Sequence, residues 1–384
     1  MLKIVTIIGA RPQIIKASAI SRAVKDYFAT QITEIIVHTG QHYDPAMSQV
    51  FFGELSIPQP HYNLNVGSGA HGVQTAKMIE GIEKILIDEK PDWIVLYGDT
   101  NSTLAGAIAA AKIHVPIAHI EAGLRSYNKA MPEEINRIMC DHASTLLFSP
   151  TSTGYDNLMR EGFSADTTQK ASANAPHVYH CGDVMFDNLL HFSTIANQKT
   201  TLLHDLKLTP NNYILATVHR DNNTDVPERL HAILRSMNTI STQHNLAVVL
   251  PLHPRTRKIL AQPQHEDIMA ELAANAHFHI IEPLSYLQMI VMQHNARLIM
   301  TDSGGVQKEA FFFAKPCIIL RHETEWTELI TCGMATLCDA DGDKIITAFN
   351  VFNTKKVAEL PNLYGDGAAA QFILGKLLTE HTAL

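Results

Sequence analysis

The stretch TDSGGVQKEAFFF, from Thr301 to Phe313, decides how the second half of the chain folds. The apolar run at residues 298–300 predicts a buried parallel strand, and a helical pattern begins at Val306. Gly304 and Gly305 lie between them, where the lack of a Cβ lets a ligand approach the backbone. The N–H groups at the helix start point outward, and the helix dipole favours an anion beside them. The turn therefore predicts a diphosphate site.

Two side chains extend this interpretation. Ser303 can donate its hydroxyl to a phosphate, and Glu309, about one turn further into the helix, can reach a ribose diol. An ordinary strand-turn-helix, with Ser303 as the N-cap, accounts for the same residues. The stretch alone leaves both interpretations open.

Short apolar runs alternate with helical patterns along almost the whole chain. Most runs are apolar without polar alternation, which is typical of parallel strands covered by helices on both faces. The sequence therefore predicts an α/β protein with two doubly wound Rossmann-like domains. The predicted strands are residues 3–8, 34–37, 93–97, 117–120, 145–148, 178–181, 214–218, 247–250, 279–281, 298–300 and 317–320.

A length of 384 residues also favours two domains over one. The boundary is expected after Gly182-Asp183, in front of a helix at 184–195. A segment near 165–175 is rich in Ala, Ser and Thr and is expected to be an exposed loop. A Gly-rich break at 362–367 precedes a last helix at 368–378.

Composition excludes several classes of function. The net charge is −8 without a basic block, so no nucleic-acid partner is expected. Five cysteines, an odd number without CxxC spacing, predict reduced thiols in the cytosol. The 21 histidines show no HExxH or similar spacing, so no metal site is predicted. No apolar run approaches the ~18 residues of a membrane span, and the first residues indicate a strand rather than a signal peptide.

Ligands of open α/β sheets bind beyond the carboxyl ends of the strands. In the first half these positions are rich in carboxylates with a few bases, which suits acid–base chemistry. In the second half they are rich in His, Arg and Gly, which suits an anion. The residues in question are Arg11, Lys16, Asp99 and Glu121 in the first half, and His219, Arg220, Ser303, Gly304 and Gly305 in the second.

Each of these residues also has an ordinary structural explanation. Arg11 and Lys16 can pair with surface carboxylates, and Asp99 can be the N-cap of the helix that follows. Pro132 indicates the first position of a helix. On that helix Glu133 and Arg137 are spaced i,i+4 and share a face, so they can form a stabilising surface pair. No single residue decides the matter, and the evidence is that all of them fall at strand ends.

Ten motifs spread over nearly the whole chain form a specific pattern. They are GARPQIIKAS at 9–18, TGQHYD at 39–44, YGDTNSTLAG at 97–106, HIEAGLRS at 119–126, MPEEINR at 131–137, CGDVMFD at 181–187, TVHRDNNTD at 217–225, PLHPRTRK at 251–258, TDSGGVQKEA at 301–310 and LYGDGAA at 363–369. On these motifs the chain closely resembles the non-hydrolysing UDP-N-acetylglucosamine 2-epimerase family.

The resemblance implies a glycosyltransferase-B type fold, with two Rossmann-like domains facing across a cleft. Residues 1–185 together with 366–384 would form the first domain, and 186–365 the second. It also implies inversion of C2 of a UDP-2-acetamido sugar, UDP-GlcNAc to UDP-ManNAc, through a 2-acetamidoglucal. The implied enzyme is a cytoplasmic homodimer that serves bacterial surface polysaccharide synthesis and needs no cofactor and no metal.

The resemblance also implies roles for individual residues. The positions that match the family's catalytic residues are Lys16, Asp99, Glu121, Glu133, Arg137 and His219. The positions that match its substrate-binding residues are Arg11, Arg220, Ser303, Gly304, Gly305 and Glu309.

Three departures from the family pattern concern the substrate and its regulation. The chain has HRDNNTD where HRRESFG or HRREN is usual, and TEWTE at 324–328 where TERPE is usual. The TEW form resembles the branch that includes epimerases of UDP-2,3-diacetamido-2,3-dideoxy-glucuronate, which is the alternative substrate. Beside Gln41-His42, where relatives bind a second substrate molecule as activator, residues 65–71 contain no arginine, so weak or absent activation is expected.

Two other functions stay open at this point. A retaining glycosyltransferase of the same architecture would need an acceptor, and a catalytically silent nucleotide-sugar binding protein would lack the carboxylates. A nicotinamide dehydrogenase is disfavoured because no GxGxxG follows a predicted strand.

Overall fold

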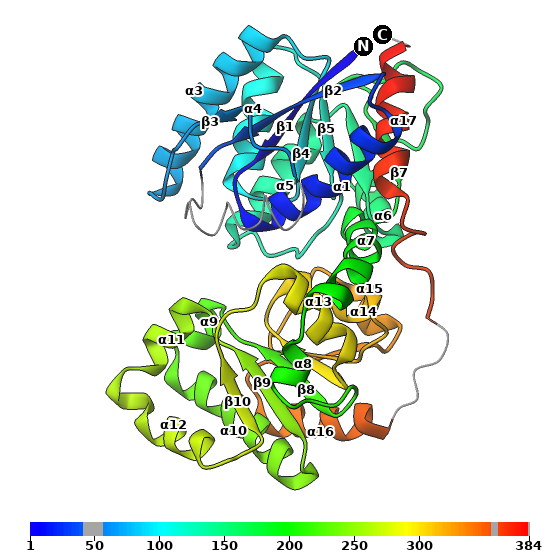
Figure 1. Ribbon diagram of the computed structural model, residues 1–384. Coiled ribbons are helices and arrows are strands. Elements are labelled where there is room, and N and C mark those ends of the chain that lie inside the picture. The colour runs from blue at the N-terminus through cyan, green and yellow to red at the C-terminus, as the bar shows by residue number, and fades with distance from the viewer. Residues whose placement is uncertain (41–56, 355–359, 383–384) are drawn as a thin grey trace. The chain divides into compact units, whose positions relative to one another are not determined.

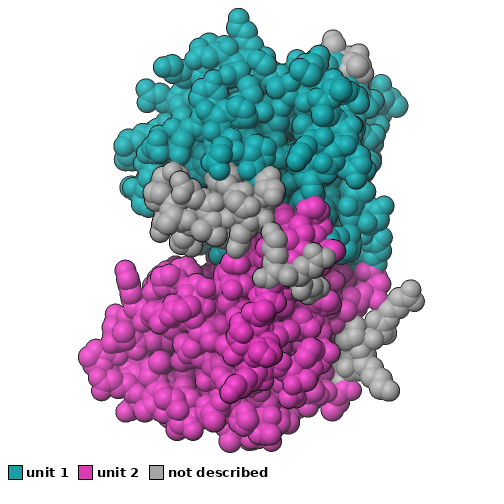
Figure 2. Space-filling model, viewed as in Figure 1, with its two compact units in different colours: residues 1–190, 362–384 teal, residues 191–361 magenta. Residues whose placement is uncertain are grey.

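The computed structural model describes residues 1–40, 57–354 and 360–382. The chain forms two compact units, one of Met1–Leu190 with Asn362–Leu384 and one of His191–Pro361, called unit 1 and unit 2 below (Figures 1 and 2). It passes from unit 1 into unit 2 within α7 (Val184–Lys199). Gln41 and His42 lie outside the described residues, and the weak or absent activation expected from residues 65–71 stays a prediction. The relative placement of the two units, and the expected cleft, stay predictions.

Unit 1 is built on a parallel sheet. Within the described residues the strand order is β3-β2-β1-β4-β5-β6-β7. The register places Val5 opposite Ile35 on one side and opposite Ile94 on the other. The strands are β1 (Leu2–Ile8), β2 (Ile32–His38), β3 (Tyr62–Asn63), β4 (Trp93–Tyr97), β5 (Ile117–Ile120), β6 (Leu146–Ser149) and β7 (His177–His180).

Helices cover both faces of this sheet (Figure 1). The apolar side chains of α3 and α4 meet those of the strands in a buried core that includes Val5, Met78 and Leu96. The sequence of α4, NSTLAGAIAAAK, supplies small buried alanines that let the helix lie close to the sheet. The helices are α1 (Arg11–Tyr27), α3 (His71–Glu89), α4 (Asn101–Lys112), α5 (Pro132–Ala143), α6 (Ser152–Arg160) and α17 (Ala369–Thr382).

The C-terminal helix α17 belongs to unit 1 and contacts α1. The N–H groups of Ala369 and Ala370 donate to the buried Asp187 carboxylate at 3.2 and 2.8 Å. At the other end Glu380 accepts a hydrogen bond from the Tyr179 hydroxyl at 2.5 Å. Both ends of the helix are therefore tied to unit 1 by buried or half-buried polar groups.

Unit 2 has a second parallel sheet, with the order β10-β9-β8-β11-β12-β13 in the described residues. Its strands are β8 (Tyr213–Thr217), β9 (Ala247–Pro251), β10 (Phe278–Ile281), β11 (Leu298–Thr301), β12 (Cys317–Ile319) and β13 (Ala335–Leu337). Side chains of α10 and α16 pack on this sheet in one core, which includes Ile214, Leu234 and Phe349. The helices are α8 (Leu202–Asp205), α9 (Asp221–Thr224), α10 (Pro227–His244), α11 (Pro254–Leu260), the 3-10 helix η1 (Pro263–His265), α12 (Glu266–Ala273), α13 (Tyr286–Asn295), α14 (Gly304–Phe312), α15 (Thr327–Thr331) and α16 (Gly342–Thr354).

The predicted class, two doubly wound α/β domains, is confirmed. All eleven predicted strands are present, with bounds that differ by at most two residues. The prediction missed β3 and β13, because strands of two and three residues that contain exposed polar positions give no apolar run. Residues 165–175 are mostly exposed, as expected. Within the described ranges, no helix is both long enough and apolar enough to cross a membrane.

Candidate active site

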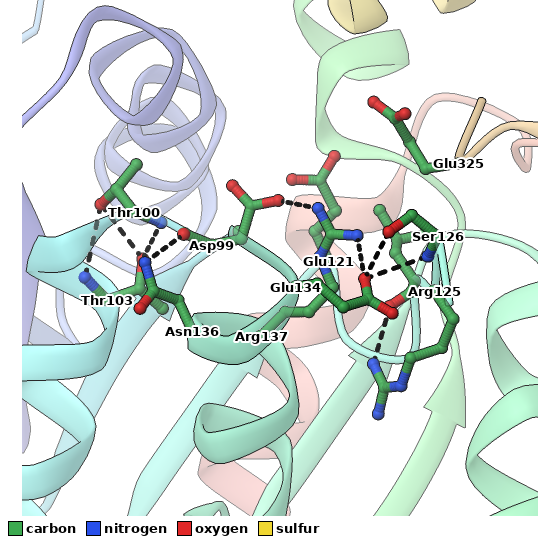
Figure 3. Close-up of polar contacts among 12 residues, drawn as sticks. Asp99, Thr100, Thr103, Glu121, Arg125, Ser126, Glu134, Asn136, Arg137 and Glu325 are labelled. Carbon is green, nitrogen blue, oxygen red and sulfur yellow. Dashed lines mark hydrogen bonds and ion pairs between the residues drawn. The ribbon is translucent and has the colours of Figure 1, made fainter. Parts of the chain in front are cut away.

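Asp99 follows β4 after Gly98, whose φ of 60° lies in the left-handed region that favours glycine. The N-cap of α4 is Thr100, whose hydroxyl accepts from the N–H of Thr103 at 3.4 Å, so the N-cap explanation of Asp99 is wrong. The Asp99 carboxylate forms an ion pair with Arg137 instead (Figure 3). Its side chain keeps 31% of its surface exposed, so this carboxylate is both paired and accessible.

Glu121 follows β5 and has a φ of 75°, which is rare for a residue with a side chain. Such a backbone costs about 1–3 kcal/mol and persists only where the surroundings enforce it. Here the N–H of Glu121 donates to the carbonyl of Phe148 at 3.0 Å. The carboxylate is largely buried and pairs with Lys16 from α1. The surface-pair explanation of Lys16 is therefore wrong, because its partner is a carboxylate at a strand end.

The helix α5 contributes a different residue from the one expected. Arg137 donates to Glu134 Oε2 at 2.7 Å, an i,i+3 contact, and the expected i,i+4 pair with Glu133 is wrong. Glu134 is buried and also accepts from the N–H groups of Ser126 and Tyr127, at 3.0 and 2.9 Å (Figure 3). Glu133 is only half-buried. Glu134 therefore fixes Arg137 beside Asp99, and the catalytic role of Glu133 stays a prediction.

The turn between β1 and α1 is held by a glutamine that the sequence did not single out. Gln13 is buried, and its Oε1 accepts from the N–H of Gly9 at 2.9 Å. Its Nε2 donates to the carbonyl of Tyr97 at 3.1 Å. This side chain ties the loop that carries Arg11 to the end of β4. Arg11 itself is exposed at the first position of α1, and its substrate-binding role stays a prediction.

In unit 2 the loops after β8 and β11 are joined by Asp302, which is fully buried. Its carboxylate accepts from the N–H of His219 at 3.0 Å and from the N–H of Arg220 at 3.0 Å. The Nδ1 of His219 lies 3.3 Å from the same carboxylate, and 36% of the His219 side chain is exposed. Because Nδ1 of the His219 ring faces Asp302, Nε2 on the other side of the ring points away from Asp302.

The two glycines at the start of α14 have different surroundings. A Cβ at Gly304 would collide with the carboxylate of Glu325, which is paired with Arg321 at 3.1 Å. A Cβ at Gly305 would meet nothing within 4 Å. The helix begins at Gly304, and Ser303 is in the N-cap position without a capping hydrogen bond from its side chain. The N-cap explanation of Ser303 therefore holds for position only.

Glu309 lies further along α14 and is nearly buried. Its Oε2 accepts from Nε2 of Gln293 on α13 at 2.7 Å. Gln293 thereby orients this carboxylate. The contact of Glu309 with a ribose stays a prediction.

The geometry of both units can be set beside known proteins. The family model described as UDP-N-acetylglucosamine 2-epimerase matches residues 27–378. The chain belongs to this epimerase family. The family predicted from the ten motifs and the isomerase class are thereby confirmed.

Two relatives show how far the similarity of this epimerase extends. It is 47% identical over 373 residues to the UDP-2,3-diacetamido-2,3-dideoxy-D-glucuronate 2-epimerase of Pseudomonas aeruginosa, covering 97% of this chain and 98% of the relative. A crystal structure of the Methanocaldococcus jannaschii UDP-GlcNAc 2-epimerase in complex with UDP-GlcNAc and UDP is 40% identical, with a TM-score of 0.85. That match covers 98% of this chain and 100% of the other. The predicted glycosyltransferase-B type fold class is confirmed.

The segment that departs from the usual TERPE pattern packs against α14 of the epimerase. Trp326 is buried, and Nζ of Lys308 lies 4.1 Å from the centre of its ring, a cation–π contact. The Thr324 hydroxyl donates to Oε1 of Gln307 at 2.6 Å. Trp326 and Thr324 are therefore packed against the helix that begins at the predicted diphosphate site.

The sequence did not assign a role to three buried polar residues of the epimerase: Gln13, Glu134 and Asp302. Each holds other groups in place and lies next to, or within a turn of, a residue that was named. Glu134 is three residues from Arg137 on a helix, so the i,i+3 spacing was available as a signal. Asp302 directly follows a buried strand, which is the position that the strand-end rule selects.

Proposed function

We propose that this epimerase inverts C2 of a UDP-2-acetamido sugar without hydrolysis, converting UDP-N-acetylglucosamine to UDP-N-acetylmannosamine. The observation that carries the proposal is a pair of carboxylates, Asp99 and Glu121, after the neighbouring strands β4 and β5. Each has its own cation, Arg137 and Lys16. Membership of the epimerase family supports the same reaction.

The chemistry explains why paired carboxylates are needed. The C2 hydrogen lies beside an acetamido group and is barely acidic, so UDP must leave before or while the proton is removed. The C1–O bond to UDP breaks, a carboxylate takes the C2 proton, and the C1–C2 double bond of a 2-acetamidoglucal forms. A second acid then protonates C2 on the opposite face, and an oxygen of UDP adds again to C1.

Two groups on opposite faces of the sugar ring are required, because a single base would restore the starting isomer. Asp99, Glu121 and Glu133 are the candidates, and general acid–base help is worth about 10²–10⁴-fold. We assign the offset of positive charge on the ring to Asp99 or Glu133. Lys16 and Arg137 hold the carboxylates in place.

Unit 2 supplies the groups that suit a nucleoside diphosphate. The N–H groups at the start of α14, together with the Ser303 hydroxyl, suit the phosphates. His219 would stabilise the departing UDP, since its ring is oriented by Asp302 and remains accessible. Arg220 is assigned to the substrate and Glu309 to the ribose. Arg11, in unit 1, is also assigned to the substrate.

Turnover of the nucleotide sugar alone tests this proposal. Purified enzyme is incubated with UDP-N-acetylglucosamine and no acceptor, and the product is examined by mass spectrometry and NMR. The expected product has unchanged mass and inverted C2. Consumption that depends on an added acceptor would identify a glycosyltransferase instead, and binding without turnover would identify a silent binding protein.

A second substrate is favoured by one specific observation, the 47% identity to the P. aeruginosa relative. If UDP-2,3-diacetamido-2,3-dideoxy-glucuronate is the natural substrate, its kcat/KM exceeds that of UDP-N-acetylglucosamine. Side-by-side rates with the two compounds decide between them, and the mechanism is the same for both.

We also infer a homodimer in the cytoplasm that supplies surface polysaccharide precursors. The five cysteines, free in the structure, are in keeping with a reducing compartment. Light scattering of the purified full chain measures the oligomeric state, and a monomer would contradict the inference.

A further inference from the structure

A buried polar network lies directly behind Glu121, and His119 is at its centre. His119 is on β5, two residues before Glu121, and its side chain is fully buried. Its Nε2 lies 2.8 Å from the carbonyl oxygen of Gly98, the residue that precedes Asp99. Its Nδ1 lies 2.6 Å from Oδ1 of Asp141 on α5. One imidazole ring therefore connects β5, the end of β4 and α5.

The partners of the ring determine its protons. A carbonyl oxygen only accepts, so Nε2 of His119 must carry a hydrogen. The other oxygen of Asp141 faces Nη1 of Arg125 at 2.7 Å and accepts from the N–H of Gly123 at 3.1 Å. These two donors favour an ionised Asp141, and an ionised carboxylate at 2.6 Å requires a donor at Nδ1. Both ring nitrogens therefore donate, and His119 is an imidazolium.

The charges around the network agree with this geometry. Burial by itself lowers the pKa of His119, but Cys140 and Asp141 outweigh it and raise that pKa well above its ordinary value. Burial raises the pKa of Asp141, but His119 and Arg125 outweigh it and the pKa is lowered. Arg125 is paired in turn with Glu161 at 2.6 Å.

The network holds the main chain on both sides of the proposed catalytic carboxylates. Gly98 is next to Asp99, while His119 and Gly123 flank Glu121 at two residues on either side. Strand pairing between β4 and β5 ends at Tyr97 and Ile120, so the loops that carry Asp99 and Glu121 begin where this pairing ends. Glu121 also has a positive φ, which in a residue with a side chain needs external support.

We propose that His119 is a positioning residue for epimerisation. Its two ring N–H groups hold the Gly98 carbonyl and the Asp141 carboxylate, and this clamp sets the separation of the Asp99 and Glu121 carboxyl groups. The effect on catalysis rests on the proposed function. The protonation of both ring nitrogens of His119 rests only on the contacts of the ring with Gly98 and Asp141. Two groups that act on opposite faces of one sugar ring are sensitive to this separation, since a misplacement of about 1 Å can cost ~10²-fold in rate.

The first measurement concerns the ring itself in the full chain. Protein labelled with ¹⁵N-histidine is studied by NMR between pH 6 and 8.5, and His119 is assigned by its loss in His119→Asn. Both ring nitrogens are expected to be protonated over this range. A ring with one unprotonated nitrogen at pH 7 would overturn the clamp, whether or not the protein proves to be an epimerase.

The second measurement concerns catalysis. Asparagine has a single donor nitrogen and cannot donate both to the Gly98 carbonyl and to the Asp141 carboxylate, so the kcat of His119→Asn is expected to fall by about 100-fold. The KM is expected to stay within about threefold, because the residues assigned to the substrate, in unit 2 and at Arg11, are intact. This is the pattern expected when only interactions made in the transition state are lost. Free UDP and 2-acetamidoglucal are expected to appear, because a displaced acid fails to complete the second half-reaction. Wild-type kcat without glycal release would overturn the proposal.

Two further variants keep the test decisive. His114→Asn changes an exposed histidine of unit 1 that follows α4, and it is expected to behave like the wild type. Asp141→Asn keeps the size of the side chain and removes its charge, so it serves if His119→Asn does not fold. It is expected to lower kcat similarly and to leave one ring nitrogen of His119 unprotonated near pH 7. An Asp141→Asn enzyme with both nitrogens protonated and full activity would contradict the clamp.

Discussion

The strand-end loops of the two units manage charge in opposite ways. In unit 1 two of the three candidate carboxylates pair with a cation, Asp99 with Arg137 and Glu121 with Lys16. In unit 2 the buried carboxylate of Asp302 accepts hydrogen bonds from main-chain N–H groups of the loop after β8. The difference agrees with the proposed function, in which unit 1 presents charged side chains for proton transfer and the main chain and a histidine of unit 2 receive an anion.

The largest effect is expected where this comparison is sharpest, at Glu121. Glu121→Gln keeps the shape of the side chain but cannot exchange a proton, so kcat should fall by about 10²–10⁴-fold. The Kd for UDP should not change, because its proposed ligands, in unit 2 and at Arg11, are intact. Steady-state kinetics and calorimetry measure the two quantities. Glu271→Gln, at an exposed surface pair, is the matched control. If UDP affinity fell by the same factor as kcat, catalysis and UDP binding would not be assigned to different units.

The reciprocal change in unit 2 should have the next largest effect. Asp302→Asn removes the charge that His219 and Arg220 contact, and a hydrogen bond to a charged group is worth about 1.5–3 kcal/mol. UDP binding should therefore weaken by about 10–100-fold by calorimetry. Circular dichroism checks that the variant is folded. Unchanged UDP affinity in a folded variant would show that Asp302 does not organise the anion site.

A smaller effect concerns the buried cation of unit 1. The folded-state pKa of His119 is raised, so its contribution to stability is complete below the unfolded value of 6.5 and is lost as pH rises through the folded value. The free energy of unfolding in urea should therefore fall as pH rises above 6.5, by at most about 1.4 kcal/mol per pH unit from this group. The same slope in His119→Asn would assign the effect to another group.

The smallest effects should separate the two glycines of α14. Gly304→Ala meets the Glu325 carboxylate and should lower the Tm. Gly305→Ala points into open space and should raise stability by about 0.5–1 kcal/mol, since alanine favours a helix. If a phosphate approaches Gly305, the same methyl group should weaken UDP binding. Equal responses of the two variants in both measurements would contradict the site.

The comparison of the units also shows which features a sequence predicts. The strands and the strand-end residues were predictable because continuous apolar runs and sheet topology determine them. The partner of Arg137 was not, because Glu133 and Glu134 are both within reach on a helix and only the path of the loop at Ser126 selects Glu134. The backbone of Glu121 was not predictable either, since nothing in a glutamate indicates a positive φ.

The central claim is that unit 1 carboxylates remove and return the proton at C2. Epimerisation in deuterated water, followed by NMR and mass spectrometry of the product, tests it most directly. One deuterium from solvent is expected at C2 of the epimerised sugar. Retention of the original hydrogen at C2 would contradict it and would indicate transfer of that hydrogen within the enzyme.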